Sequence, residues 1–149
     1  MKTTYVILAS LVALTLMGCD STPAWQKTSP EDAFRRVLLD WMMGKQDQVL
    51  QGLVKEDRAH IAAARASVVA VLPKGAKVPE AHEFLVASGV STPFAIRKMS
   101  LYEKLPSTVE PGQQARVKLE FHDGREGEAL MVWDGEAWRL RLGLSTPEG

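Results

Sequence analysis

The hydrophobic positions between residues 30 and 71 recur at the spacing of amphipathic helices. Ser29 followed by Pro30 is typical of a helix start, and Gly44 is typical of a helix end. The residues between them that would form one apolar face are Phe34, Val37, Leu38, Trp41 and Met42. The same spacing predicts a short helix at about residues 47–54 and an alanine-rich helix at about residues 56–71. A further short helix is predicted at residues 79–89.

From residue 96 onward, apolar and polar residues alternate, which is typical of strands with one buried face. The predicted strands are residues 96–105, 115–121, 128–133 and 136–142. Pro111-Gly112 suits a turn after the first strand, and an Asp-Gly pair lies at each of the two later junctions. Strands joined in this way form an antiparallel meander.

The two Asp-Gly junctions predict different loops. Between the second and third strands, a three-residue loop at 122–124 places Val117 opposite Ala129 and gathers both apolar rows on one face. In the last hairpin, a two-residue turn at 134–135 places Met131 opposite Trp138. The inward-facing set predicted for helix and strands together is Phe34, Val37, Leu38, Trp41, Val117, Leu119, Met131, Trp138 and Leu140.

Helices followed by a meander predict an α+β fold, in which N-terminal helices pack on a curved four-stranded antiparallel sheet. We expect residues 29–144 to form a single domain and residues 145–149 to form a tail. The chain has 18 basic and 18 acidic residues, so its net charge favours no nucleic-acid partner.

The N-terminus has the order of regions found in an export signal. Lys2 precedes an apolar run from Tyr5 to Leu16. As a helix this run would reach only about 18 Å, whereas the hydrocarbon core of a membrane is about 30 Å thick. We therefore expect residues 1–18 to be a signal peptide rather than a membrane span.

The only cysteine of the chain, Cys19, follows this run. The sequence Leu16-Met17-Gly18-Cys19 resembles the lipobox of bacterial lipoproteins, in which the cysteine sulfur receives a diacylglycerol and the signal is cut before the cysteine. The resemblance implies that Cys19 carries acyl chains such as palmitate and makes the membrane a partner of the protein. Several acyl chains hold a protein firmly at a membrane, whereas one holds it only marginally. Residues 19–28 would then be a lipidated tether.

The same resemblance implies a place in the bacterial cell envelope, facing the periplasm. Asp20 resembles the signal that keeps enterobacterial lipoproteins at the inner membrane, so the inner membrane is favoured over the outer one. Trp25 in the tether has two interpretations: it lies at the headgroup level of the membrane, or it packs on the domain.

Two segments of the domain carry a resemblance to known proteins: "PEDAFRRVLLDWMMGKQDQVLQGLVKEDRAHI", residues 30–61, and "LMVWDGEAWRLRL", residues 130–142. They resemble uncharacterised bacterial lipoproteins with the nuclear transport factor two-like fold, also called the cystatin-like cone. The resemblance implies a cone-like domain. Enzymes of this fold class carry an Asp, His or Tyr that points into the cone, whereas the inward strand positions of this chain are apolar.

The sequence shows no constellation of catalytic residues. His60, His82 and His122 lie far apart in the sequence, and the one cysteine is the expected lipidation site, so neither a metal nor a cofactor is expected. Nucleophile and phosphate-loop motifs are also absent from the sequence. The candidates for an inward polar group are Tyr102, Glu103 and the indole N–H groups of Trp41, Trp133 and Trp138. A pocket in the cone would be lined by Trp41, Tyr102, Met131, Trp133 and Trp138, although a tryptophan set of this kind is more often plain core.

These features predict a membrane-anchored lipoprotein that is a non-catalytic binding or protein-interaction module. A small apolar ligand would need a pocket, whereas a protein partner would need an exposed apolar patch, such as Leu130 with Val132 on the outer sheet face. That patch would also suit a homodimer, but Arg139 and Arg141 on the same face favour solvent. The alternative is a small-molecule enzyme of isomerase or dehydratase type that uses a pocket inside the cone.

Overall fold

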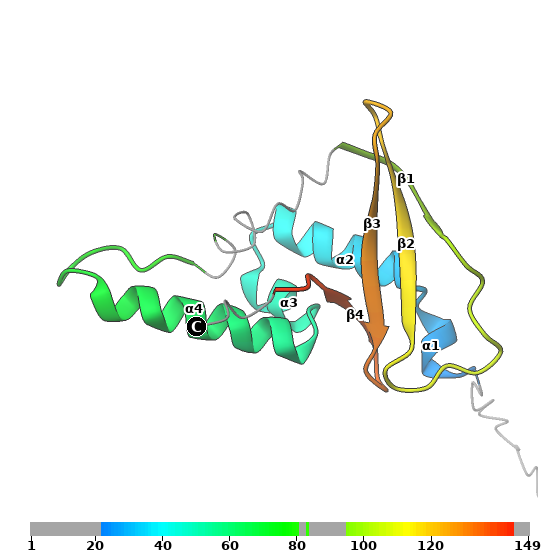
Figure 1. Cartoon of the computed structure of the whole chain (residues 1–149), viewed down its shortest axis with the longest axis horizontal. Helices are drawn as coiled ribbons and strands as arrows, with labels where there is room; N and C mark the ends of the chain where they lie inside the picture. Colours follow the sequence, from blue (N-terminus) through cyan, green and yellow to red (C-terminus); the bar gives the residue numbers. More distant parts are fainter. Residues whose placement is uncertain (1–21, 81–82, 84–94, 145–149) are drawn as a thin grey trace, which may run out of the picture.

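The computed structural model describes residues 22–80, 83 and 95–144. The predicted signal peptide, Cys19, most of the helix predicted at 79–89 and the predicted tail lie outside the described residues. Figure 1 shows one sheet standing beside a group of helices, with α2 (Pro30–Met42) crossing behind it. The chain is therefore an α+β protein, as the order of its sequence patterns predicts.

The helices begin and end close to the predicted positions. The Ser29 side chain accepts a hydrogen bond of 3.1 Å from the Asp32 N–H at the start of α2, and Gly44 has a φ of +68° just beyond its end. The next two helices are α3 (Gln46–Gln51) and α4 (Lys55–Val71). Local capping residues and apolar spacing therefore predicted these three helices correctly.

A fourth helix, α1 (Ala24–Lys27), lies within the segment predicted to be a tether. Trp25 in this helix is partly buried and packs against the hydrophobic core. Of the two interpretations of Trp25, the structure therefore favours packing on the domain.

The sheet has four antiparallel strands in the order β1-β2-β3-β4. Their bounds are Ile96–Leu101, Gln114–Phe121, Glu126–Trp133 and Trp138–Arg141. The first strand is shorter than predicted because a bend follows Leu101. The meander order is confirmed.

The predicted register of β2 and β3 is confirmed. Val117 lies opposite Ala129, and Ala115 lies opposite Met131. The loop at 122–124 is closed by a hydrogen bond of 2.9 Å from the Phe121 N–H to the Arg125 carbonyl, and Gly124 has a φ of +83°. Only glycine adopts this left-handed conformation without strain, which explains its place at the end of the loop.

The predicted register of β3 and β4 is wrong by two residues. Trp133 lies opposite Trp138 and Met131 lies opposite Leu140, so the loop has four residues, 134–137. The Asp134 carboxylate accepts hydrogen bonds from the backbone N–H groups of Glu136 and Ala137, at 2.9 and 2.8 Å, and so stabilises the longer loop. Because side chains alternate with a period of two, an even shift leaves the same residues on the inner face.

The core lies between α2 and the inner face of the sheet. α2 contacts all four strands, and Phe34, Val37 and Leu38 on its inner face are buried. The predicted inward strand residues are also buried, whereas Trp41 is only partly buried at the edge of the core.

The outer edge of β4 is covered by residues 52–54, which join α3 to α4. The Leu140 N–H donates to the Gly52 carbonyl at 2.8 Å, and the Leu140 carbonyl accepts from the Val54 N–H at 2.9 Å. Leu53 between them is fully buried. This bridge protects an edge strand that would otherwise expose its hydrogen-bonding groups.

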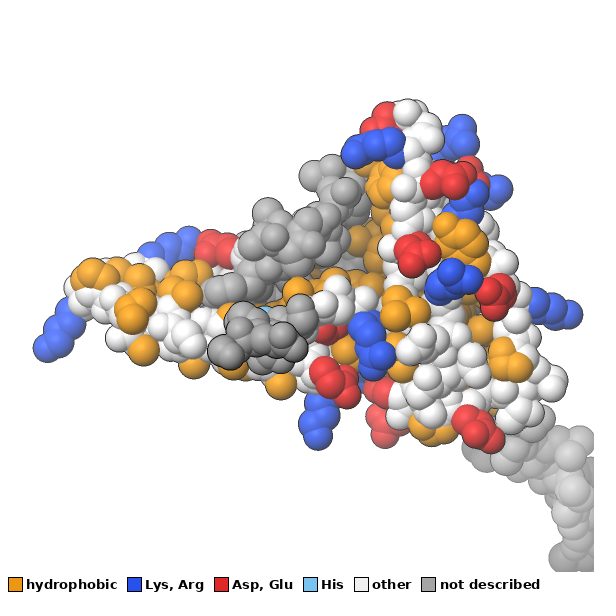
Figure 2. All heavy atoms as spheres, viewed as in Figure 1, with side chains coloured by type: hydrophobic (Ala, Val, Ile, Leu, Met, Phe, Trp, Pro, Cys, Tyr) orange, Lys and Arg blue, Asp and Glu red, His pale blue; other side chains and the backbone are white. Residues whose placement is uncertain are grey.

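α4 extends away from the sheet, so the helices do not all pack on the sheet face (Figure 1). Asp57 and Ile61 near its start are its only buried residues, and Val71 at its end is 81% exposed. Figure 2 shows apolar side chains along this helix and interspersed charges over the strands.

Candidate binding site

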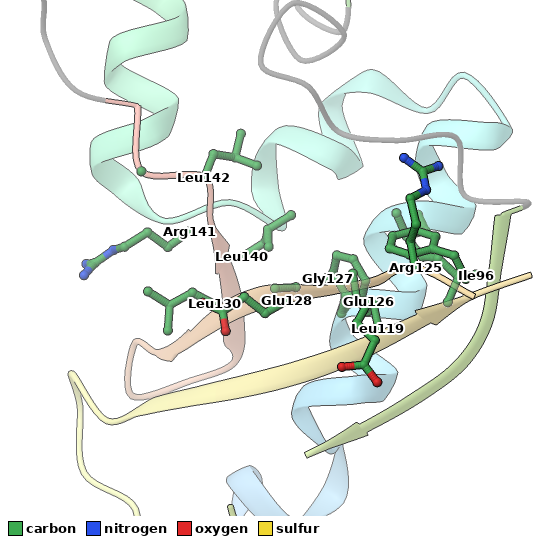
Figure 3. A pocket seen from close by; sticks show the side chains of 15 residues that line it. Ile96, Leu119, Arg125, Glu126, Gly127, Glu128, Leu130, Leu140, Arg141 and Leu142 are labelled. Atoms are coloured by element: carbon green, nitrogen blue, oxygen red, sulfur yellow. The ribbon is translucent and has the colours of Figure 1, made fainter. Parts of the chain in front are cut away.

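A cavity of about 550 Å³ lies between α2 and the sheet, where β3 begins and β4 ends (Figure 3). All four strands and α2 contribute to it. Its apolar wall consists of Phe34, Leu38, Ile96, Leu119, Phe121, Ala129, Leu140 and Leu142. Its volume falls in the usual range of small-molecule pockets, which is about 300–1,000 Å³.

The cavity forms where β3 contributes its smallest inward residues. The inward row of this strand runs Gly127, Ala129, Met131 and Trp133. Met131 and Trp133, which are 0% and 4% exposed, fill the space between strand and helix at one end. Gly127 and Ala129 fill less of that space at the other end, where both line the cavity together with the Phe121 ring.

Phe121 forms the wall beside Gly127. A Cβ atom on Gly127 would lie 3.0 Å from Cε2 of the Phe121 ring, so the ring occupies the place of the missing side chain. The Arg125 guanidinium lies 5.7 Å from the centre of the same ring. The Phe121 ring thus contacts both Gly127 and the guanidinium group of Arg125.

Charged residues lie at the rim of the cavity rather than in its apolar wall. Arg125 Nε donates to Asp123 at 2.7 Å, and the backbone N–H of Arg125 donates to the same carboxylate at 3.0 Å. The backbone N–H first, and then the guanidinium, hold the pKa of Asp123 below its ordinary value. The Glu126 carboxylate lies 2.6 Å from Lys118 Nζ and raises the pKa of that lysine. The arrangement suits the burial of an apolar group rather than proton transfer.

Asp57 holds the chain beside the cavity in place. This carboxylate is 3% exposed and lies in the first turn of α4. It accepts hydrogen bonds from the backbone N–H groups of Leu142, at 2.6 Å, and Leu144, at 3.3 Å. Sequence reasoning missed this contact, because an acidic residue in the first turn of a helix is ordinarily exposed.

The predicted pocket residues lie elsewhere. Met131, Trp133 and Trp138 are buried in the core, and the two indole rings lie 5.7 Å apart at an angle of 58°. Trp133 and Trp138 line a second hollow of about 480 Å³, at the end of β3 away from the first cavity. Tyr102 is 44% exposed, and the Arg116 guanidinium lies 5.2 Å from the centre of its ring. None of the five predicted pocket residues lines the larger cavity.

The expected apolar patch on the outer sheet face is not formed. Val132 is only 7% exposed, so the prediction of an exposed Leu130–Val132 pair was wrong. Arg139 beside it donates to Asp134 at 2.7 Å and to the Gln51 carbonyl at 2.8 Å. These polar contacts link the outer face to α3.

The polar candidates for catalysis are not brought together. Glu103 is exposed and pairs with Arg116 at 2.8 Å, and neither residue lines the cavity. Within residues 22–80, 83 and 95–144, no three His, Cys, Asp or Glu side chains are grouped to hold a metal ion. In the same part of the chain, no helix combines the length and apolar character needed to cross a bilayer.

Comparison of the chain with protein-family models, with curated proteins and with solved structures found no match.

Proposed function

We propose that this protein is a lipid-anchored binding module of the bacterial cell envelope. The lipobox-like sequence Leu16-Met17-Gly18-Cys19, after a basic and then apolar N-terminus, supports an anchor at Cys19 and a domain that faces the periplasm. Asp20 favours the inner membrane. The order of helices and antiparallel strands supports a cone-like domain of the nuclear transport factor two-like kind.

The observation that carries the binding function is the apolar cavity between α2 and the sheet. Its wall is formed by side chains of α2 and all four strands, and its charged residues lie at the rim. Such a site buries an apolar group of a ligand and places polar groups where they orient it. The ligand class is therefore an apolar small molecule or an apolar side chain of a partner.

The anchor is tested by mass spectrometry of the protein purified from bacterial membranes. We expect a chain that begins at Cys19 and carries acyl groups. Cys19→Ala should release the protein from the membrane fraction or leave it unprocessed, whereas Ser21→Ala in the tether should change neither property. A chain with an intact signal, or with a free thiol on Cys19, would contradict the proposal.

The cavity is tested with the fluorescent apolar dye 8-anilinonaphthalene-1-sulfonate. We expect the folded domain to bind the dye and Ala129→Leu to weaken binding about tenfold, because the larger side chain fills the space beside Gly127. The matched control is Ala63→Leu on the exposed surface of α4, which adds the same volume outside the cavity. Thermal unfolding confirms that both variants fold. Equal dye binding by both variants would remove the cavity from the proposal.

A further inference from the structure

The cavity opens beside a stretch of β3 that has no strand paired with it on one side among residues 22–80, 83 and 95–144. β4 pairs only with residues 130–133 of β3. Residues 126–129 pair with β2, and no other described segment pairs with them. β4 stops pairing with β3 after Arg141. The residues that follow turn toward α4, where Asp57 accepts hydrogen bonds from the N–H groups of Leu142 and Leu144. Beyond the contact at Asp57, no described residue pairs with this edge of the sheet next to the cavity.

The main-chain groups on this open edge belong to Glu126 and Glu128. The Trp133 N–H donates to the Gln113 carbonyl, and the Trp133 carbonyl accepts from the Gly112 N–H, so Trp133 presents its groups toward β2. Because this direction alternates along an antiparallel strand, Gly127 and Ala129 also present theirs toward β2. Glu126 and Glu128 therefore present an N–H and a carbonyl each to the open side.

A strand added at this edge would direct alternate side chains into the cavity. Residues of the added strand opposite Gly127 and Ala129 would share their inward face. These two positions carry the smallest inward side chains of β3, and the cavity wall begins beside them. An added strand therefore meets both a backbone edge that no described segment pairs with and a volume for its apolar side chains.

The negative charge of Glu128 on the outer face favours a basic residue at the outward position of an added strand. Lys118 lies opposite Glu128 in the register, yet its ion pair of 2.6 Å is with Glu126. No ion pair with Glu128 is found among the described residues, and its side chain is exposed. A basic residue opposite Glu128 would complement this charge across the strands.

We propose that residues 126–129 of β3 bind an extended peptide as an additional strand in line with β4, with apolar residues in the cavity and a basic residue beside Glu128. The proposal rests on the binding function proposed above and names the partner as a peptide segment of alternating apolar and basic residues. Recognition combines main-chain hydrogen bonds with side-chain pockets, as in other cases of strand addition.

The test uses a capped six-residue peptide that alternates leucine and lysine, added to the isotope-labelled domain. We expect its binding to shift the NMR signals of residues 126–130 and to slow exchange of the Glu126 and Glu128 amide protons about tenfold. A second peptide, N-methylated at alternate residues along the edge that would pair with β3, should bind at least about tenfold more weakly, because it cannot donate hydrogen bonds to the Glu126 and Glu128 carbonyls. Equal binding of both peptides would overturn the proposal.

Two variants of one residue separate backbone from side-chain recognition. Glu128→Pro removes the outward N–H without removing a hydrogen bond to β2 and should abolish peptide binding. Glu128→Gln keeps the backbone groups and should weaken binding less, with most of the loss removed by high salt. An equal loss of peptide affinity in the two variants would contradict main-chain pairing of the peptide with β3.

The same measurements distinguish other occupants of the edge. Slow exchange of both amides without peptide, at every protein concentration, would mean that the chain itself covers the edge and would overturn the proposal. Slow exchange that appears only as protein concentration rises would assign the edge to a second copy and would also overturn it. If the dye binds the cavity and the peptide does not bind, this inference fails and the proposed binding function stands. If neither the dye nor the peptide binds, both this inference and the proposed binding function fail.

Discussion

At the scale of single residues, Gly52 shows how one missing side chain positions two elements. Its φ of −71° is helical, so its backbone conformation is open to any residue. A Cβ atom on it would nevertheless collide with Cγ2 of Val37 in α2. Its carbonyl accepts the hydrogen bond from Leu140 that covers the edge of β4. Glycine is therefore required here by close approach and not by backbone conformation.

We expect Gly52→Ala to lower the free energy of unfolding by about 1–3 kcal/mol, because the added methyl group overpacks the contact with α2. Urea denaturation followed by circular dichroism measures the loss. In the background of Val37→Ala, which removes the colliding atom, Gly52→Ala should lower the free energy of unfolding by less. An equal loss in both backgrounds would show that the collision is not the cause.

At the scale of elements, the β3–β4 hairpin depends on Asp134. Partial burial acts to raise the pKa of this carboxyl group. Hydrogen bonds from Arg139 and from the backbone N–H groups of Ala137 and Glu136 outweigh that effect, so the pKa of Asp134 lies below its ordinary value. The charged form thus stabilises both the loop and the attachment of Arg139.

A carboxyl group with a lowered pKa stabilises the fold at pH values above its unfolded pKa, which is about 4 for aspartate. The stabilisation is lost as the pH falls through the lower pKa of the folded state. Asp134→Asn should therefore be less stable than the original protein at pH 7, and the difference should shrink below about pH 4. Denaturation at pH 7, 5, 3 and 2 measures both proteins. A difference that stays constant down to pH 2 would contradict the role of the charge.

At the scale of the whole molecule, the interior is filled unevenly along the sheet. Trp133 and Trp138 occupy one end, and the cavity beside Gly127 and Ala129 occupies the other. Large buried side chains are therefore concentrated at the end with the two indole rings, and the cavity lies at the opposite end. Among the described residues, no hydrogen-bond partner is found for the buried Nε1 atom of Trp138, so this ring contributes through its apolar surface.

Trp138→Ala should lower the free energy of unfolding by about 3–5 kcal/mol, because the side chain is almost fully buried. Trp138→Phe should lower the free energy of unfolding far less, since phenylalanine keeps most of the apolar volume and lacks the buried N–H group. Trp41→Ala should lower the free energy of unfolding less than Trp138→Ala, because Trp41 is only partly buried. Urea denaturation ranks the three variants, and a loss below about 1 kcal/mol for Trp138→Ala would mean that the ring is not part of the core.

Part of the candidate site was accessible from the sequence. The alternation in β3 predicts which residues face inward, and Gly127 and Ala129 are visibly the smallest of that row. The prediction relied on the tryptophan residues, which lie at the other end of β3 from the larger cavity, because aromatic side chains are found both in filled cores and in pockets. Only the packing of α2 on the sheet shows which end is filled.

The sequence by itself determined the features that depend on neighbouring residues. Apolar spacing and capping at Ser29 and Gly44 placed α2, and the shape of the loop at 122–124 set the register of β2 against β3. The register of β4, the contact of Asp57 with residues 142 and 144 and the cavity were decided only by the tertiary structure. Each of these joins residues far apart in the chain or depends on a volume left unfilled, and neither distance in space nor empty volume leaves a periodic pattern in the sequence.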